Sequence, residues 1–197
     1  FFILIDNLRL DQWKVLKPFI TEHFWIDTED IYYSILPTTT QYARNSIFAG
    51  MMPSEIEKRF PDKWSNDDEE GGKNLEEQFF IDEQLKRNQL NVKTSYNKVL
   101  NLSYGNKVLG DIPSLFNNPF NVIVYNFVDM LSHARTDTQI IKELAADEAA
   151  YRSVVKSWFE HSPLISTLKE IAARGGTLFI TTDHGSIRVK DAVKIVG

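Results

Sequence analysis

The stretch FFILID, residues 1–6, is a run of five apolar residues that stops at an aspartate. An apolar run without polar alternation is typical of a parallel strand that is buried on both faces of a sheet. Two later stretches have the same form, FNVIVYNFVD at 120–129 and TLFITTD at 177–183. We therefore expect a buried strand in each stretch, and an aspartate directly after each strand.

Between these stretches, apolar residues recur at the spacing of an α-helix. The first such pattern runs from Trp13 to Phe24, and Ser162 followed by Pro163 is typical of a helix start. The helices that the sequence predicts cover residues 13–24, 41–50, 75–90, 138–160 and 163–174. Strands that alternate with helices predict a mostly parallel sheet with helices on both faces, which is an α/β fold.

The composition limits the chemistry that is available. The 197 residues carry a net charge of −5 and include no cysteine. Disulfides and zinc–thiolate sites are therefore excluded, and a metal would need carboxylate, imidazole or hydroxyl ligands. Because the chain is acidic, a phosphorylated substrate would need bound divalent cations to attract it. No apolar run is long enough to span a bilayer, and the stretch SNDDEEGG at 65–72 is typical of a charged loop.

The three aspartates that follow the strands are Asp6, Asp129 and Asp183. In open α/β sheets, ligands bind outside the carboxyl ends of the strands, so these carboxylates should gather at one edge. Two histidines accompany them: His133 is four residues after Asp129, and His184 directly follows Asp183. One aspartate after a strand is usually a turn residue, but three of them, two with a nearby histidine, indicate a site for zinc or manganese.

Three threonines follow a fourth apolar run, Ile31–Leu36, and should reach the same edge. A hydroxyl beside a divalent cation loses its proton more easily and can attack phosphorus. The N-terminus of the helix that follows would favour a phosphate. Arg44, one turn further on, could bind that phosphate or form a surface salt bridge. Thr38 and Thr39 are more typical of turn and cap hydroxyls.

These stretches also carry a resemblance to a known family. LIDNLRLDQW at 4–13, LPTTTQYARNSIFAG at 36–50 and TTDHGS at 181–186 resemble the PglZ domain, a branch of the alkaline phosphatase superfamily. The resemblance covers almost all of residues 1–197 and implies an alkaline-phosphatase-like three-layer fold with a mostly parallel sheet. It also implies a phosphodiesterase whose nucleophile is Thr40, chosen by its spacing from Gly50.

The resemblance implies two zinc ions in a complete site, with manganese as an alternative. The first ion would be held by Asp6, Thr40, Asp183 and His184, and the second by Asp129 and His133. The sequence departs from the superfamily at Asn7, where relatives have glycine or alanine. It also lacks the further histidine that the superfamily uses for the second ion. Either that histidine lies beyond Gly197, or this chain holds only one metal firmly.

A narrower resemblance concerns residues 31–64. Their sequence is similar to that of the PglZ-containing response regulators of the type IX secretion system. It implies a cytoplasmic protein with a receiver domain before residue 1, which would make this chain a fragment. It further implies a homodimer, a sensor kinase and a sigma factor as partners, and linear or cyclic oligonucleotides as substrates. Two alternatives stay open: a metal-stabilised signalling or dimerisation module with weak or no hydrolysis, and a phosphomonoesterase.

Overall fold

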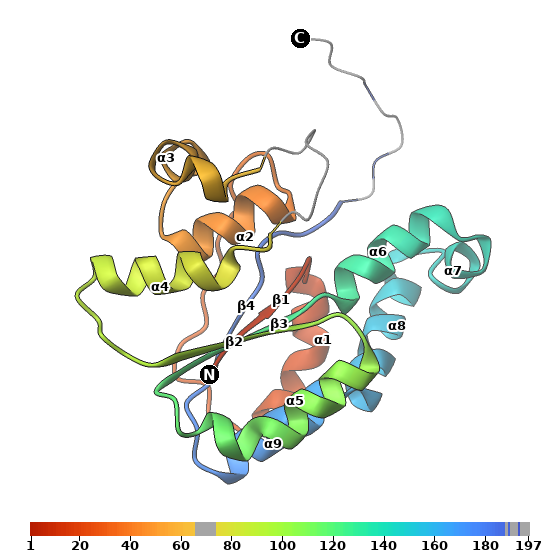
Figure 1. Cartoon of the computed structure of the whole chain (residues 1–197). Helices are drawn as coiled ribbons and strands as arrows, with labels where there is room; N and C mark the ends of the chain where they lie inside the picture. Colours follow the sequence, from red (N-terminus) through yellow and green to blue (C-terminus); the bar gives the residue numbers. More distant parts are fainter. Residues whose placement is uncertain (66–73, 188, 190–192, 194–197) are drawn as a thin grey trace.

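The chain folds around one parallel sheet. The computed structural model describes residues 1–65, 74–187, 189 and 193. In these residues four strands pair in the order β2-β3-β1-β4, and every neighbouring pair is parallel. The strands are β1 (Phe2–Ile5), β2 (Thr94–Val99), β3 (Phe120–Tyr125) and β4 (Phe179–Thr181). Figure 1 shows helices on both sides of this sheet, so the predicted three-layer α/β architecture is confirmed.

The helices divide between the two faces of the sheet (Figure 1). One face is covered by α2 (Thr40–Ala49), α3 (Pro53–Arg59) and α4 (Glu77–Arg87), with a 3₁₀ turn at Pro61–Lys63. The other face is covered by α1 (Leu10–Thr21), α5 (Leu102–Leu115), α8 (Glu148–His161) and α9 (Pro163–Ala173). Helices α6 (Phe127–Asp137) and α7 (Gln139–Leu144) follow β3. None of the described helices has the length and hydropathy needed to cross a membrane.

Alternation along β1 explains why its sequence is apolar at every position. Ile3 and Ile5 pack into the core beneath α1, α5, α8 and α9, whereas Leu4 packs into the core beneath α2, α3 and α4. All three side chains are essentially inaccessible to solvent. A strand with a helical layer on both faces has no polar side, and this is the reason for the continuous apolar run.

The register of the sheet brings the strand ends together. Ile5 pairs with Tyr125 of β3, and Leu4 pairs with Thr181 of β4. The backbone N–H of Asp6 then donates to the carbonyl of Tyr125 at 2.9 Å, so the chain leaves β1 in a fixed direction. The residues that follow β1, β3 and β4 therefore meet at one edge of the sheet.

Several predicted helix boundaries are confirmed. Ser162 caps α9 by accepting a hydrogen bond from the N–H of Leu164, and Pro163 is the first helical residue. Gly50 ends α2 in the left-handed conformation with φ of 58°, which glycine adopts without strain. Helix α4 lies inside the predicted range 75–90, while α1 ends at Thr21, so Phe24 lies beyond it. Most of the charged stretch at 65–72 lies outside the described residues.

The fourth apolar run, Ile31–Leu36, is not a strand. It is an irregular surface segment, and the side chains of Ile31 and Leu36 are 71% and 86% exposed. The segment is attached beyond β4 by side-chain hydrogen bonds instead of a backbone ladder. The hydroxyl of Tyr32 donates to the carbonyl of Thr182, and that of Ser34 donates to the carbonyl of Asp183 at 2.7 Å.

Three further expectations need correction. The helix predicted over 138–160 is divided into α7 and α8, because Asp147 accepts a hydrogen bond from the N–H of Ala150 at 2.7 Å and starts a new helix. Strand β3 ends at Tyr125 instead of continuing to residue 128, and Asp129 lies in the first turn of α6. Strand β4 is shorter than predicted and only partly buried, with Phe179 58% exposed.

The contrast between Leu4 and Leu36 can be tested by unfolding. Leu4→Ala should lower the free energy of unfolding by about 2–5 kcal/mol, because it leaves a cavity between the sheet and its helices. Leu36→Ala removes the same atoms from an exposed side chain and should change stability by less than about 0.5 kcal/mol. Urea denaturation followed by circular dichroism measures both values, and equal losses would contradict the assigned burial.

Candidate active site

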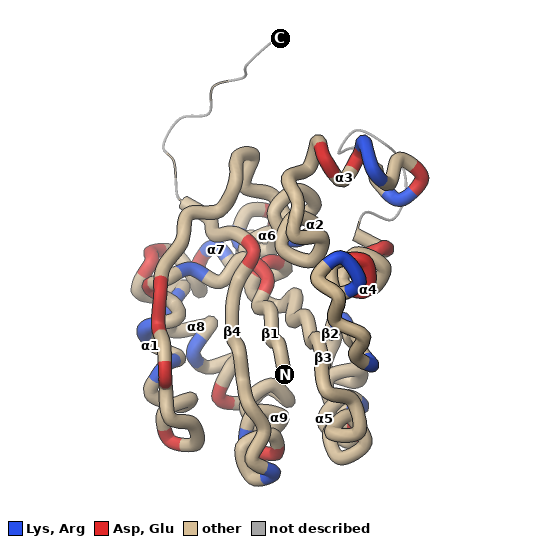
Figure 2. The backbone as a smooth tube through the Cα atoms, turned by 90° about the vertical axis from the view of Figure 1, so that its left-hand side faces the viewer, with Lys and Arg blue, Asp and Glu red and all other residues tan. Residues whose placement is uncertain are grey.

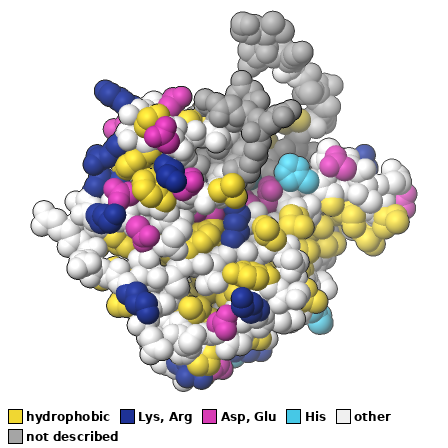
Figure 3. Space-filling model, in the orientation of Figure 1, with side chains coloured by type: hydrophobic (Ala, Val, Ile, Leu, Met, Phe, Trp, Pro, Cys, Tyr) yellow, Lys and Arg dark blue, Asp and Glu magenta, His cyan; other side chains and the backbone are white. Residues whose placement is uncertain are grey.

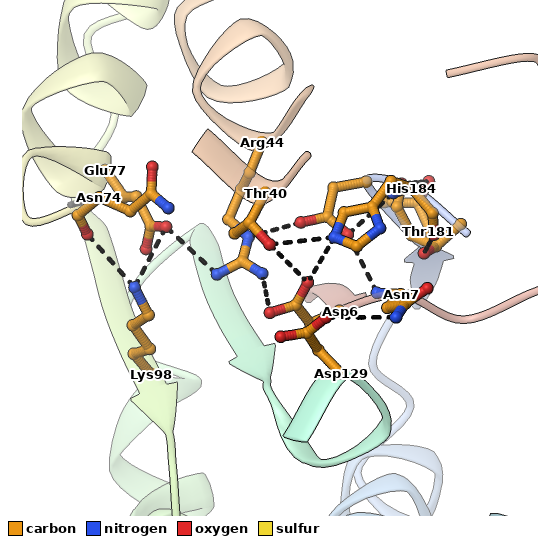
Figure 4. Close-up of polar contacts among 12 residues, drawn as sticks. Asp6, Asn7, Thr40, Arg44, Asn74, Glu77, Lys98, Asp129, Thr181 and His184 are labelled. Carbon is orange, nitrogen blue, oxygen red and sulfur yellow. Dashed lines mark hydrogen bonds and ion pairs between the residues drawn. The ribbon is translucent and has the colours of Figure 1, made fainter. Parts of the chain in front are cut away.

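Polar side chains converge at the carboxyl edge of the sheet. Asp6 follows β1, Asp183 and His184 follow β4, and Thr40 is the first residue of α2. Figure 4 shows the side chains of Asp6, Thr40 and His184 pointing toward one another, although they come from segments far apart in the sequence. Figure 2 shows acidic residues where β1 and β4 end, on the side of the sheet where α2 lies.

Thr40, Asp6 and His184 are in direct contact. The Thr40 hydroxyl oxygen lies 3.4 Å from Asp6 Oδ1 and 3.0 Å from His184 Nε2, and His184 Nε2 lies 3.3 Å from Asp6 Oδ1. Asp183 is fixed beside them, because its Oδ1 accepts hydrogen bonds from the backbone N–H groups of Asn7 and His184.

These residues fit a divalent cation. One ligand atom from each of Asp6, Asp183 and His184 can be chosen so that all three lie within 4.8 Å of one another, and all three residues are buried. Two carboxylates, one imidazole and an adjacent hydroxyl are the donor types that zinc and manganese accept. The predicted first metal site is therefore assembled in space, and its occupancy stays a prediction.

Arg44 lies inside this group of carboxylates. Its guanidinium is fully buried and forms ion pairs with Asp6, with Asp183 at 2.8 Å and with Glu77 at 3.3 Å. The sequence left open a surface salt bridge or a phosphate contact. The structure shows ion pairs that are buried, and a contact of Arg44 with phosphate stays a prediction.

The second predicted metal pair is more open. Asp129 and His133 lie one turn apart on α6, with Asp129 Oδ2 3.5 Å from His133 Nε2, and the His133 side chain is 75% exposed. The side-chain amide of Asn7 donates to Asp129 Oδ1 at 3.2 Å, which ties α6 to the loop after β1. Figure 4 shows the carboxylate of Asp129 next to that of Asp6.

Burial and close charges set the protonation states. Burial alone would raise the pKa of Asp6, but the hydrogen bond with His184 and the charge of Arg44 outweigh it and lower that pKa to about 2. Burial raises the pKa of Asp183 against the pull of Arg44. Burial alone would lower the pKa of His184, but its hydrogen bond to Asp6 and the charges of Asp183, Asp6 and Asp129 raise it.

Sequence reasoning missed Glu77 and Lys98. The Glu77 carboxylate is buried and accepts hydrogen bonds from Arg44, from Lys98 at 3.3 Å and from the hydroxyl of Tyr96. One signal could have identified it, because Glu77, Phe80 and Ile81 have the spacing of one helix face and only Glu77 is polar. Lys98 belongs to β2, whose mixed polar sequence did not predict a strand.

With this geometry established, comparison with known proteins identifies the family. The sequence model of the BREX system PglZ alkaline phosphatase-like domain matches residues 1–197. The chain belongs to this family. The resemblance to the PglZ domain is thus confirmed, and the α/β sheet is consistent with an alkaline-phosphatase-like fold. No curated protein matches the chain significantly.

Membership of the PglZ family indicates hydrolase activity on phosphoesters and dependence on a metal. Among the residues that the structure describes, the buried Asp6, Asp183 and His184 form a group that could hold that metal. The identity of the ion and the narrower resemblance to response regulators stay predictions.

Removal of one ligand should weaken metal binding. We expect His184→Ala to lower the affinity for zinc at least about 100-fold, because even second-shell partners contribute 10- to 100-fold. Titration against a chromophoric chelator measures this affinity. His161→Ala is the matched control, because His161 is an exposed residue at the end of α8 whose ring contacts the carbonyl of Ser157 one turn earlier. Equal affinity of the two variants would contradict the assigned site.

Metal affinity should also depend on pH. The imidazole of His184 must lose its proton to bind a metal, and its pKa is raised above the ordinary 6.5. Affinity should therefore fall as the pH drops through that raised pKa, by about tenfold per pH unit below it. Asp6, with a pKa of about 2, stays ionised throughout. Without bound metal, the free energy of unfolding should depend on pH in the opposite direction. The charged imidazole of His184 stabilises the fold, and this contribution is lost as the pH rises through its raised pKa. A pH-independent zinc affinity would contradict this assignment.

Proposed function

We propose that this PglZ domain is a metal-dependent phosphodiesterase with Thr40 as its nucleophile. The supporting observation is the position of the Thr40 hydroxyl, at the N-terminus of α2 and within 3.4 Å of both Asp6 and His184. Zinc ions held by these residues and by Asp183 would lower the pKa of the hydroxyl and neutralise the charge on the substrate. In this proposal Asp129 and His133 hold the second ion.

Thr40 would act in two steps. Its Oγ1 forms a bond to phosphorus while the ester bond to the departing alcohol breaks, and that alcohol takes up a proton. Water then attacks the phosphothreonine, releases the phosphomonoester and restores the hydroxyl. The first backbone N–H groups of α2 would bind the phosphate oxygens, because they have no partners within the helix.

The biological setting is a separate part of the proposal and rests on sequence resemblance alone. We propose that the domain belongs to a cytoplasmic response regulator of type IX secretion that resembles PorX and that dimerises. In this setting its substrates are linear or cyclic oligonucleotides, and its partners include a sensor kinase and a sigma factor.

One observation favours the alternative of a signalling module with weak hydrolysis. His133 is largely exposed, and two carboxylates of the first site already have Arg44 as a counter-ion. In this alternative, metal would stabilise the domain, while Thr40 would have no catalytic role.

Cleavage of bis(p-nitrophenyl) phosphate by zinc-loaded protein distinguishes the two functions. Thr40→Ala should lower kcat at least about 1,000-fold, because it removes the attacking oxygen. Thr38→Ala is the matched control, since it removes an exposed hydroxyl two residues before α2 and should change kcat less than about twofold. Measured zinc content should be retained in Thr40→Ala.

Two results would count against the enzyme. Equal rates for wild type and Thr40→Ala would exclude Thr40 as nucleophile. Bound zinc without diester cleavage in the wild type, together with a loss of dimerisation in Asp183→Asn, would favour the signalling module.

A further inference from the structure

A cavity of about 470 Å³ opens beside Thr40. Thr40, Asp6 and Asp129 line it, and so do Leu75, Lys98 and Leu100. This volume lies in the range of small-molecule sites and exceeds what one phosphate group occupies. The cavity can therefore hold more of a substrate than its reacting phosphate.

Two cations on the wall of this cavity share one buried carboxylate. Glu77 Oε1 lies 3.3 Å from a terminal nitrogen of Arg44 and 3.3 Å from Lys98 Nζ. Lys98 Nζ also donates to the carbonyl of Asn74 at 3.2 Å. Figure 4 shows Lys98 and Arg44 on opposite sides of Glu77, with Arg44 nearer to Thr40. Glu77 thus fixes two positive groups at different distances from the nucleophile.

The charge balance of this group changes when a metal is bound. Arg44 also pairs with Asp6 and Asp183, which are the candidate metal ligands. Once a metal neutralises those carboxylates, Arg44 and Lys98 have Glu77 as their shared counter-ion. Arg44 and Lys98 then have one carboxylate between them, and this part of the cavity wall would attract an anionic group.

Lys98 is able to make such a contact. An ammonium group has three N–H donors, and Glu77 and Asn74 use two of them. The side chain is 22% exposed and lines the cavity, so the remaining donor can reach a ligand. Lys98 is held in place at both acceptors, which lowers the entropy lost when it binds an anion.

The rest of the wall combines apolar and polar groups. Leu75 and Leu100 border the cavity, and the two residues are 76% and 51% exposed. Asn126 also borders it, and its buried side-chain oxygen has no hydrogen-bond partner among the described residues. Figure 3 shows hydrophobic and basic side chains beside one another in the middle of this face. An apolar surface with a cation and an amide suits the sugar, base and phosphate of a nucleotide.

On the basis of the proposed function, we infer that this cavity binds the part of the substrate beyond the reacting phosphorus. Lys98 binds a second phosphate there, so the preferred substrate is an oligonucleotide with at least two phosphates. An ester with a single phosphate would leave Lys98 without its ligand.

A binding experiment tests this inference without turnover. Zinc-loaded Thr40→Ala protein would be titrated by calorimetry with thymidine dinucleotides. TpT has only the internal phosphate, whereas pTpT and TpTp each carry a further phosphate at one end. We expect one of the two phosphorylated forms to bind at least about tenfold more tightly than TpT, as a charge-assisted hydrogen bond provides.

The same titration in variants assigns that gain to Lys98. In the Thr40→Ala background, Lys98→Met should remove the tenfold preference and leave the affinity for TpT within about twofold, while Lys98→Arg should keep most of it. Lys142→Met, an exposed lysine on α7, is the matched control and should have no effect.

Two outcomes would overturn the inference. One is equal affinity of the Thr40→Ala protein for TpT, pTpT and TpTp. The other is an equal loss for all three dinucleotides in Lys98→Met, which would mean that Lys98 only supports the fold. Failure of the proposed function would appear in a different experiment, as absence of diester cleavage by the wild-type protein. The dinucleotide affinities are measured in Thr40→Ala and do not depend on that result.

Discussion

The ion pairs of Arg44 are the interaction on which the carboxyl edge of the sheet depends. Parallel strands bring Asp6 and Asp183 to the same edge, and α4 adds Glu77, so three carboxylates are buried close together. Removing a carboxylate from water costs several kcal/mol, and like charges add repulsion. The guanidinium of Arg44 offsets both costs, since it contacts all three groups and its pKa is raised by them. Arg44 therefore keeps three carboxylates close together, and two of them are candidate metal ligands.

The parts of the site that were predictable follow from local periodicity. A strand between two helical layers is apolar at every position, so β1 and the start of β3 could be predicted from the sequence. The aspartates that come after these strands could then be predicted to lie at the carboxyl edge of the sheet. The structure brings Asp6, Asp183 and His184 together as expected. Thr40, chosen through the family resemblance, is the first residue of α2 and lies beside them, and its role as nucleophile stays a prediction.

The parts that were missed depend on long-range contacts. Whether an apolar run becomes a strand is decided by its neighbours. The hydrogen bonds that join Ile31–Leu36 to Thr182 and Asp183 come from side chains and not from a backbone ladder. The role of Glu77 depends on cations from α2 and β2, which are distant in sequence. The division between α7 and α8 results from one helix cap at Asp147. The prediction missed this local signal because apolar residues keep a regular helical spacing across it.

The spacing of Thr40 and Arg44 on one helix limits where residues can be inserted into this domain or deleted from it. Each residue of an α-helix turns the next by about 100°, so one residue inserted between them would rotate Arg44 away from Asp6 and Asp183. A deletion there would do the same. The irregular segment between α1 and α2 has no such constraint, because its backbone takes no part in the sheet. Insertions and deletions in homologous domains should therefore accumulate at residues 22–36 and be absent from residues 40–44.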